Sequence, residues 1–292
     1  MTEKRIENQI TIDIPNRRKI LKSLGMAGAM AVGVPGAGLQ LKAQSSTPSA
    51  TDVVQFALNL EYLEAEFYSV ATTGKTLEER GIDVSGIGTP GPTTTSFGAV
   101  NFSNNIVFTG LVAQDIAADE LAHVQILRQA LTANGVTPIA KPAINLDALA
   151  VHGASLANEA SFVTLARVFE DTGATAYSGA APFLQNSPYL ATAARITAVE
   201  GFHAANLRLQ VARLGLPSPQ VDAADVIPPP SGSNFFATNL ANGLCATRTP
   251  GEVLFLVYGN VAGAMSGGFF PNGVNGNINT STGPATAANL DT

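Results

Sequence analysis

Two pairs of a glutamate and a histidine, each three residues apart, constrain the fold of this chain more than any other feature. The pairs are Glu120–His123 and Glu200–His203. A spacing of three places both side chains of a pair on one face of an α-helix, one turn apart. Both pairs continue stripes of apolar residues at helical spacing, so that Ile116 precedes the first pair on the same face. We therefore expect these polar side chains to point into the protein interior.

Two further glutamates, each followed by a tyrosine seven residues later, complete a repeated pattern. They are Glu61 with Tyr68 and Glu170 with Tyr177. Seven residues is two helical turns, so each glutamate shares a helix face with its tyrosine. The chain thus contains a glutamate with its tyrosine, then Glu-x-x-His, and then the same two again. Core packing alone does not explain this duplication.

Burying a charged carboxylate is costly unless a fixed partner compensates it, and a divalent cation shared by several carboxylates is such a partner. Di-iron and di-manganese carboxylate bundles take a single glutamate from each of two helices and Glu-x-x-His from each of the other two. The four segments of this chain supply the same set. The sequence therefore predicts two divalent metal ions in the core of a four-helix bundle, with iron as the first choice and manganese as the alternative.

Helix signals predict an all-α fold over residues 52–217. The expected helices run from an N-cap at Asp52 to Ala71, over 103–133, over 155–184, and from 187 to about 214. A long irregular loop at 72–101 joins the first two. Hydrophobic residues make up 46% of the chain and Trp is absent, which favours close-packed helices. Residues 218–292 are expected to be an irregular appendage with one short helix at 250–258, packed on the bundle, and its last dozen residues are expected to be mobile.

The first 43 residues have the features of a twin-arginine signal peptide. Asn16–Lys22 contains Arg17 and Arg18, and a Gly- and Pro-interrupted apolar run follows, with Ala43 offering a cleavage site. Residues 44–51 are then a linker. The alternative is an anchor that stays in the membrane. We expect export to the periplasm or beyond through the twin-arginine machinery, with no stable membrane insertion after cleavage.

Charge excludes some partners. Of 16 basic and 22 acidic residues, seven and three lie in the first 43 positions, which leaves nine and nineteen and a net charge of −10. Nucleic acids and anionic membranes require basic patches, so neither is an expected partner. Cys245 is the only cysteine and forms no internal disulfide. An oligomer is compatible with the sequence, which does not define its state.

Three motifs carry a resemblance to a known family. They are the run from Leu60 to Glu64 with Phe67-Tyr68, the run from Glu170 to Gly173 with Ala176-Tyr177, and Gly267-Gly268-Phe269-Phe270-Pro271. With the Glu-x-x-His pairs, they make the chain similar to the ferritin-like superfamily, and more closely to the ferritin-like family that includes desiccation-related proteins. The superfamily resemblance covers about 52–216, and the narrower one extends into the tail.

The resemblance implies a role for each residue. Glu61 and Glu170 would be terminal or bridging ligands, Glu120 and Glu200 would bridge the metals, and His123 and His203 would each bind one. Tyr68 and Tyr177 would hydrogen-bond the ligand carboxylates. Glu64 lies on nearly the same face as Glu61 and is the alternative ligand. His152 is expected at the surface. So are six acidic residues that are not candidate ligands: Glu66, Glu78, Glu79, Asp115, Asp119 and Glu159.

The function implied is that of a di-iron or di-manganese oxidoreductase. Such a centre would act on oxygen or peroxide in stress protection. This assignment depends on the analogy of fold, because the sequence defines no substrate pocket. The alternative is a non-enzymatic stress or desiccation-related protein of the cell envelope, in which metal is structural or absent.

Overall fold

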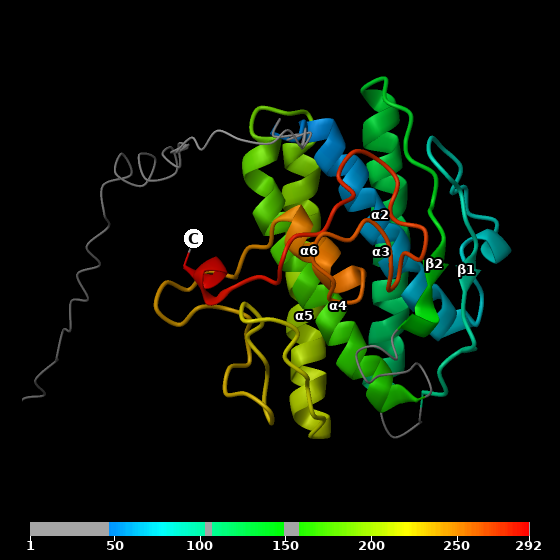
Figure 1. Ribbon diagram of the computed structural model, residues 1–292. Helices are drawn as coiled ribbons and strands as arrows, with labels where there is room; N and C mark the ends of the chain where they lie inside the picture. Colours follow the sequence, from blue (N-terminus) through cyan, green and yellow to red (C-terminus); the bar gives the residue numbers. More distant parts are fainter. Residues whose placement is uncertain (1–46, 103–106, 149–157, 292) are drawn as a thin grey trace, which may run out of the picture. The chain divides into compact units, whose positions relative to one another are not determined.

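Four long helices form the body of the protein in the part of the chain that the structure describes (Figure 1). They are α2 (Ala50–Thr73), α3 (Val107–Ala133), α4 (Glu159–Ala180) and α5 (Leu190–Leu214). Helix α2 packs chiefly against α3, and α4 against α5. The predicted all-α bundle is confirmed. None of the described helices is long and apolar enough to cross a lipid bilayer.

The computed structural model describes residues 47–102, 107–148 and 158–291. The predicted signal segment 1–43, the first part of the linker, the expected start of the second helix at 103 and the loop residue His152 lie outside these ranges.

Helix α2 begins three residues earlier than predicted. Its N-cap is Ser49, whose hydroxyl accepts a hydrogen bond from the backbone N–H of Asp52. The Asp52 carboxylate accepts in turn from the Ser49 backbone, at 3.0 Å. Asp52 is therefore the third residue of a capping box and not the cap itself, and the end of the predicted linker belongs to the helix.

The other helix ends follow local signals, with small shifts. Asn158 caps α4, and the last residues of the predicted third helix form a 3₁₀ turn, Ala181–Leu184. Helix α5 begins at Leu190 instead of 187 and ends at Leu214, and the following Gly215 adopts φ 62°. A left-handed glycine of this kind stops a helix at no steric cost.

The long connection between α2 and α3 is held by a buried lysine. The connection contains a 3₁₀ turn, Glu78–Arg80, and a short strand β1 (Thr93–Thr94), which pairs in parallel with β2 (Ile144–Asn145). Lys141 Nζ donates to Thr93 Oγ1 at 2.8 Å and lies 2.9 Å from the Glu78 carboxylate. It also lies 3.4 Å from Glu66, which is buried. The expectation that Glu66 is solvated is therefore wrong.

The segment after α5 is irregular but fixed by hydrogen bonds. It contains α6 (Pro250–Val257) and a 3₁₀ turn, Ala287–Leu290, so the prediction of a single short helix missed the second turn. Asn289 donates to the Thr247 carbonyl at 2.9 Å and accepts from the Thr247 backbone at 3.0 Å. These bonds hold part of the segment for which mobility was expected, and the mobility itself stays a prediction. Asn59 and Asn275 exchange two hydrogen bonds that join the tail to α2.

Buried ion pairs also join this segment to the bundle. Arg208 of α5 lies 2.7 Å from Asp171 of α4 and donates to the Phe235 carbonyl. Arg167 of α4 lies 2.8 Å from Asp225. Both guanidinium groups are buried. Breaking a buried pair leaves an uncompensated charge in the interior, so these arginines matter far more than exposed ones.

Replacing Arg208 tests this anchoring. We expect Arg208→Met to lower the free energy of unfolding by about 3–5 kcal/mol, because Asp171 loses its closest cation. Arg195→Met is the matched control on the exposed side of the same helix, and its effect should stay within about 0.5 kcal/mol. Urea denaturation followed by circular dichroism measures both, and equal effects would contradict the assignment.

Candidate metal centre

Six polar side chains from the four long helices meet in the core. They are all buried: Glu61 from α2, Glu120 and His123 from α3, Glu170 from α4, and Glu200 and His203 from α5. The four glutamates are fully inaccessible to solvent, and the two histidines are 6% exposed. The structure thus brings together all six residues that the sequence pattern singled out.

The six side chains form two groups that share one residue. The first contains Glu61, Glu120, His123 and Glu200, and the second contains Glu120, Glu170 and His203. In each group the candidate ligand atoms lie within 4.8 Å of one another. The imidazole rings are 6.3 Å apart, centroid to centroid. The geometry is therefore that of two adjacent sites.

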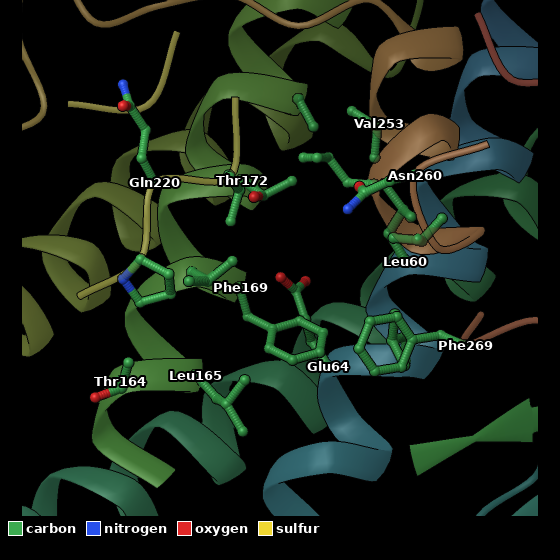
Figure 2. Close-up of a pocket in the computed structure, with 18 of the residues that line it drawn as sticks. Leu60, Glu64, Thr164, Leu165, Phe169, Thr172, Gln220, Val253, Asn260 and Phe269 are labelled. Atoms are coloured by element: carbon green, nitrogen blue, oxygen red, sulfur yellow. The ribbon is translucent and has the colours of Figure 1, made fainter. Parts of the chain in front are cut away.

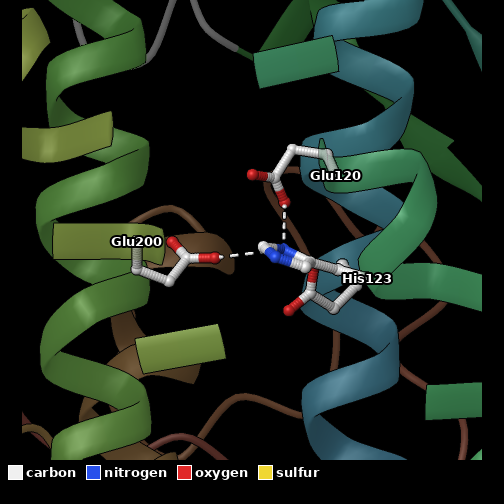
Figure 3. Close-up of side chains that lie close together, drawn as sticks. Glu120, His123 and Glu200 are labelled. Carbon is white, nitrogen blue, oxygen red and sulfur yellow. Dashed lines mark hydrogen bonds and ion pairs between the residues drawn. The ribbon is translucent and has the colours of Figure 1, made fainter. Parts of the chain in front are cut away.

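Glu120 occupies the point where the two groups meet. Its Oε2 lies 3.2 Å from His123 Nδ1, and its Oε1 lies 3.1 Å from His203 Nδ1. Figure 3 shows His123 between Glu120 and Glu200, whose Oε1 is 3.5 Å from the same nitrogen. A carboxylate that turns one oxygen to each of two sites is placed to bridge two ions.

His203 has a second carboxylate neighbour on its outer side. Its Nδ1 lies 3.0 Å from Glu170 Oε2, and its Nε2 lies 3.0 Å from Asp119 Oδ2. An Nε2–H held by a carboxylate leaves Nδ1 available as a ligand and fixes the orientation of the ring. Asp119 is half exposed, and its sequence position gives only one clue: it directly precedes Glu120.

Each of the two tyrosines on α2 and α4 faces a glutamate of the other helix. The Tyr177 hydroxyl of α4 donates to Glu61 Oε1 of α2. Burial raises the pKa of Tyr68 and Tyr177, and the facing carboxylate adds to this effect: Glu170 for Tyr68 and Glu61 for Tyr177. Each phenol therefore remains protonated and faces the glutamate of the other helix.

Glu64, the alternative to Glu61, lies beside the two groups and belongs to neither. It is buried, and its carboxylate and that of Glu200 both lie against Gly173 of α4. A methyl group at Gly173 would overlap the Glu200 carboxylate and come within 3.2 Å of Glu64 Oε1. The glycine inside this helix thus makes room for two side chains of the site.

Residues 49–213 match the sequence model of the family described as ferritin-like domain. This range covers more than half of the chain and all six clustered side chains. The chain belongs to the ferritin-like domain family. No curated protein is similar enough to count as a match.

The histidines of this ferritin-like centre are strongly affected by the carboxylates around them. Burial lowers the pKa of His123, but Glu61 and Glu120 outweigh it and raise the value to about 11. Burial likewise lowers the pKa of His203, while Glu120 and Glu170 raise it to about 10. In the absence of another cation, both rings are therefore protonated at neutral pH and serve as counter-ions.

The same crowding raises the pKa values of several carboxylates. Burial, with repulsion from Glu170, raises the pKa of Glu120 to about 7. Burial and Glu120 raise the pKa of Glu200 and of Glu64 well above the usual range. Protons thus compensate part of a negative charge that the two imidazolium groups do not neutralise.

The residues present fit a pair of divalent cations. Four buried carboxylates match the charge of two such ions, and carboxylate and imidazole donors suit iron and manganese. Neither oxygen of Glu200 accepts a hydrogen bond from any residue of the described chain. A buried carboxylate without donors must either take up a proton or be compensated by a nearby cation, so this position suits a metal ion.

Sequence reasoning missed three features of this region. Asp119 contacts His203, Glu159 is buried, and Gly173 gives the carboxylates their space. The two acids were expected to be solvated. A glycine inside an otherwise helical pattern is a signal for close approach, but the sequence does not say which side chain approaches it.

Two glycine-to-alanine changes test the role of Gly173. We expect Gly173→Ala to lower the free energy of unfolding by about 1–3 kcal/mol, because the methyl group displaces Glu200. Gly201→Ala in α5 is the matched control. No atom lies within 4 Å of the place that its methyl group would occupy, so the change should raise stability by about 0.5–1 kcal/mol through helix propensity. Thermal denaturation of both variants gives the signs, and a gain for Gly173→Ala would contradict the packing argument.

Proposed function

We propose that this ferritin-like protein binds two divalent metal ions, iron or alternatively manganese, and uses them as an oxidoreductase of oxygen or peroxide. The single observation that supports it most is the Glu120 carboxylate, which turns one oxygen toward each histidine at 3.2 and 3.1 Å. No ordinary packing role requires four buried carboxylates and two imidazoles at one point.

The two groups assign the ligands to two ions. Glu61, His123 and Glu200 would hold one ion, Glu170 and His203 the other, and Glu120 would bridge them. The resemblance implies Glu200 as a second bridge, but in the structure this residue belongs only to the group that contains His123, and not to the group of His203. The second site thus has fewer protein ligands than the first, which leaves it more room for a small exogenous ligand.

Iron or manganese bound at this place supplies the redox chemistry toward oxygen or peroxide. The chain's own residues fix the geometry. Asp119 orients His203, the Tyr177 hydroxyl holds Glu61, and the apolar core around them excludes water. Hydrogen-bond partners of this kind would hold the ligand side chains in a fixed orientation when an ion binds.

We further propose that the protein is exported through the twin-arginine pathway and acts in stress protection outside the cytoplasm. The support is the pattern Asn16–Lys22 followed by a broken apolar run. That pathway carries proteins that are already folded, which suits a protein that binds metal before export.

Metal analysis of the purified full chain tests the proposed function. We expect about two iron or manganese ions per chain. Glu120→Gln should lose both ions, because it serves both groups, whereas His203→Ala should lose chiefly one. Glu79→Gln, at an exposed position, is the control and should keep both.

The outcomes separate the candidate functions. Two ions with consumption of oxygen or peroxide support the oxidoreductase. Two ions without turnover support the structural alternative, in which metal only joins the helices. A wild-type protein that binds no iron or manganese contradicts the oxidoreductase and the structural role of metal, and leaves only the alternative in which metal is absent.

The affinity for metal should depend strongly on pH. An ion must displace protons from His123 and His203, with pKa values of about 11 and 10, and from Glu120 below about 7. We therefore expect the apparent affinity for Mn²⁺ to fall at least about tenfold per pH unit between about pH 8 and pH 6. Calorimetry in buffers of different ionisation enthalpy measures the protons released, and a pH-independent affinity would contradict the ligand set.

Export has its own test. We expect the double substitution Arg17→Lys and Arg18→Lys to keep the protein in the cytoplasm at its full, uncleaved length, because the machinery reads the paired arginines. Lys4→Arg is the control outside the motif. Fractionation followed by immunoblotting measures the distribution of the protein between compartments, and unchanged export of the double variant would contradict the assignment of a twin-arginine signal.

A further inference from the structure

An apolar pocket lies between the bundle and the C-terminal segment. Its volume is about 260 Å³, and α2, α4 and α6 line it together with Pro219–Val221 and Phe269. Close-packed interiors contain few voids larger than a water molecule, so a cavity of this size is not a packing defect. Glu64 is the only acidic or basic residue in its lining.

The inner end of the pocket abuts the candidate metal centre. Glu64, Gly173 and Tyr177 line the pocket. Gly173 lies against the carboxylates of both Glu64 and Glu200, and Tyr177 donates to Glu61. Figure 2 shows the Glu64 carboxylate among the lining side chains. One layer of side chains therefore separates the cavity from the ligand groups.

The outer end of the pocket reaches the protein surface. Gln220 and Asn260, both exposed, lie at its edge and offer amide groups (Figure 2). Between these amides and Glu64 the walls are mostly apolar, with Leu63, Phe169 and Leu256 as examples. Thr164 and Thr172 are the threonines in this lining. Polar groups thus occur chiefly at the two ends, an arrangement that recognises an apolar body with a polar terminus.

We propose that this pocket binds an uncharged, largely apolar organic molecule of about ten carbon atoms, scaled from a 150 Å³ cavity that holds benzene. Its polar end faces Glu64, beside the metal centre. An anionic terminus is excluded, because it would meet Glu64 and the carboxylates behind it. Binding of this molecule depends on the pocket alone. Its role as a substrate of the metal centre rests on the proposed function.

The probe is 1-decanol, which has ten carbons and an uncharged hydroxyl. We expect calorimetry with the purified full chain to show one molecule bound per chain, and decanoate of the same length to bind at least about tenfold more weakly. Thr172→Phe places a ring in the cavity and should weaken decanol binding at least about tenfold. Thr197→Phe, at a half-buried threonine of α5 outside the pocket, should leave it unchanged.

A second readout locates the probe relative to the centre. In Mn²⁺-loaded protein, 1-decanol should alter the electron paramagnetic resonance spectrum of the wild type and of Thr197→Phe, but not that of Thr172→Phe. If circular dichroism shows that Thr172→Phe does not fold, Val168→Phe replaces it on the same wall.

The results distinguish the pocket assignment from the proposed function. Metal-loaded protein that binds no decanol overturns the pocket assignment and leaves the proposed function standing. Binding that survives both filling variants, or that leaves the manganese spectrum unchanged, also overturns it. Decanol binding that Thr172→Phe abolishes, in a chain that holds no metal, supports the pocket and contradicts the proposed function.

Discussion

Burying four carboxylates and two imidazoles at one point is the constraint on which the rest of this structure depends. Each carboxylate removed from water loses its hydration, and this burial, together with repulsion from Glu170, raises the pKa of Glu120 to about 7. Neighbouring side chains compensate part of this cost. The two histidines act as counter-ions, Tyr177 donates to Glu61, and Asp119 holds His203 from outside. Two divalent cations would compensate the same charge more completely, which is why the arrangement favours metal over a purely structural cluster.

The helices are built around this cluster and not only around apolar contacts. Helix α4 contains a glycine at 173 where the Glu200 carboxylate needs space, and another at 179, where the backbone of Arg248 lies against the helix. A glycine in a helix costs about 0.5–1 kcal/mol relative to alanine. The helix therefore gives up local stability at two positions, one for the site and one for docking of the C-terminal segment.

The C-terminal segment gives the bundle a feature that four helices alone would not provide. Buried pairs such as Arg167 with Asp225, and hydrogen bonds between Asn59 and Asn275, fix irregular backbone against α2 and α4. With that backbone in place, α6 and Phe269 form the outer wall of a cavity whose inner wall touches the ligand groups. The segment thus completes a pocket that lies between the protein surface and the buried carboxylates.

The sequence by itself determined the helices and the candidate site. Periodicity and repeated spacing act within one or two turns of a helix, so the placement of Glu120 beside His123 in the interior was predictable. The choice of Glu61 over Glu64 as a ligand stays a prediction, although only Glu61 belongs to a cluster of candidate ligands in the described chain. The caps were predictable to within a few residues, and the ferritin-like fold followed from the duplicated pattern. The tertiary structure alone decided everything that depends on approach between distant segments. Asp119 meets His203 across 84 residues, Glu66 is buried by Lys141, and the pocket needs Pro219–Val221 and α6 against α4. Local spacing carries no information about such contacts, because they arise only when separate elements pack together.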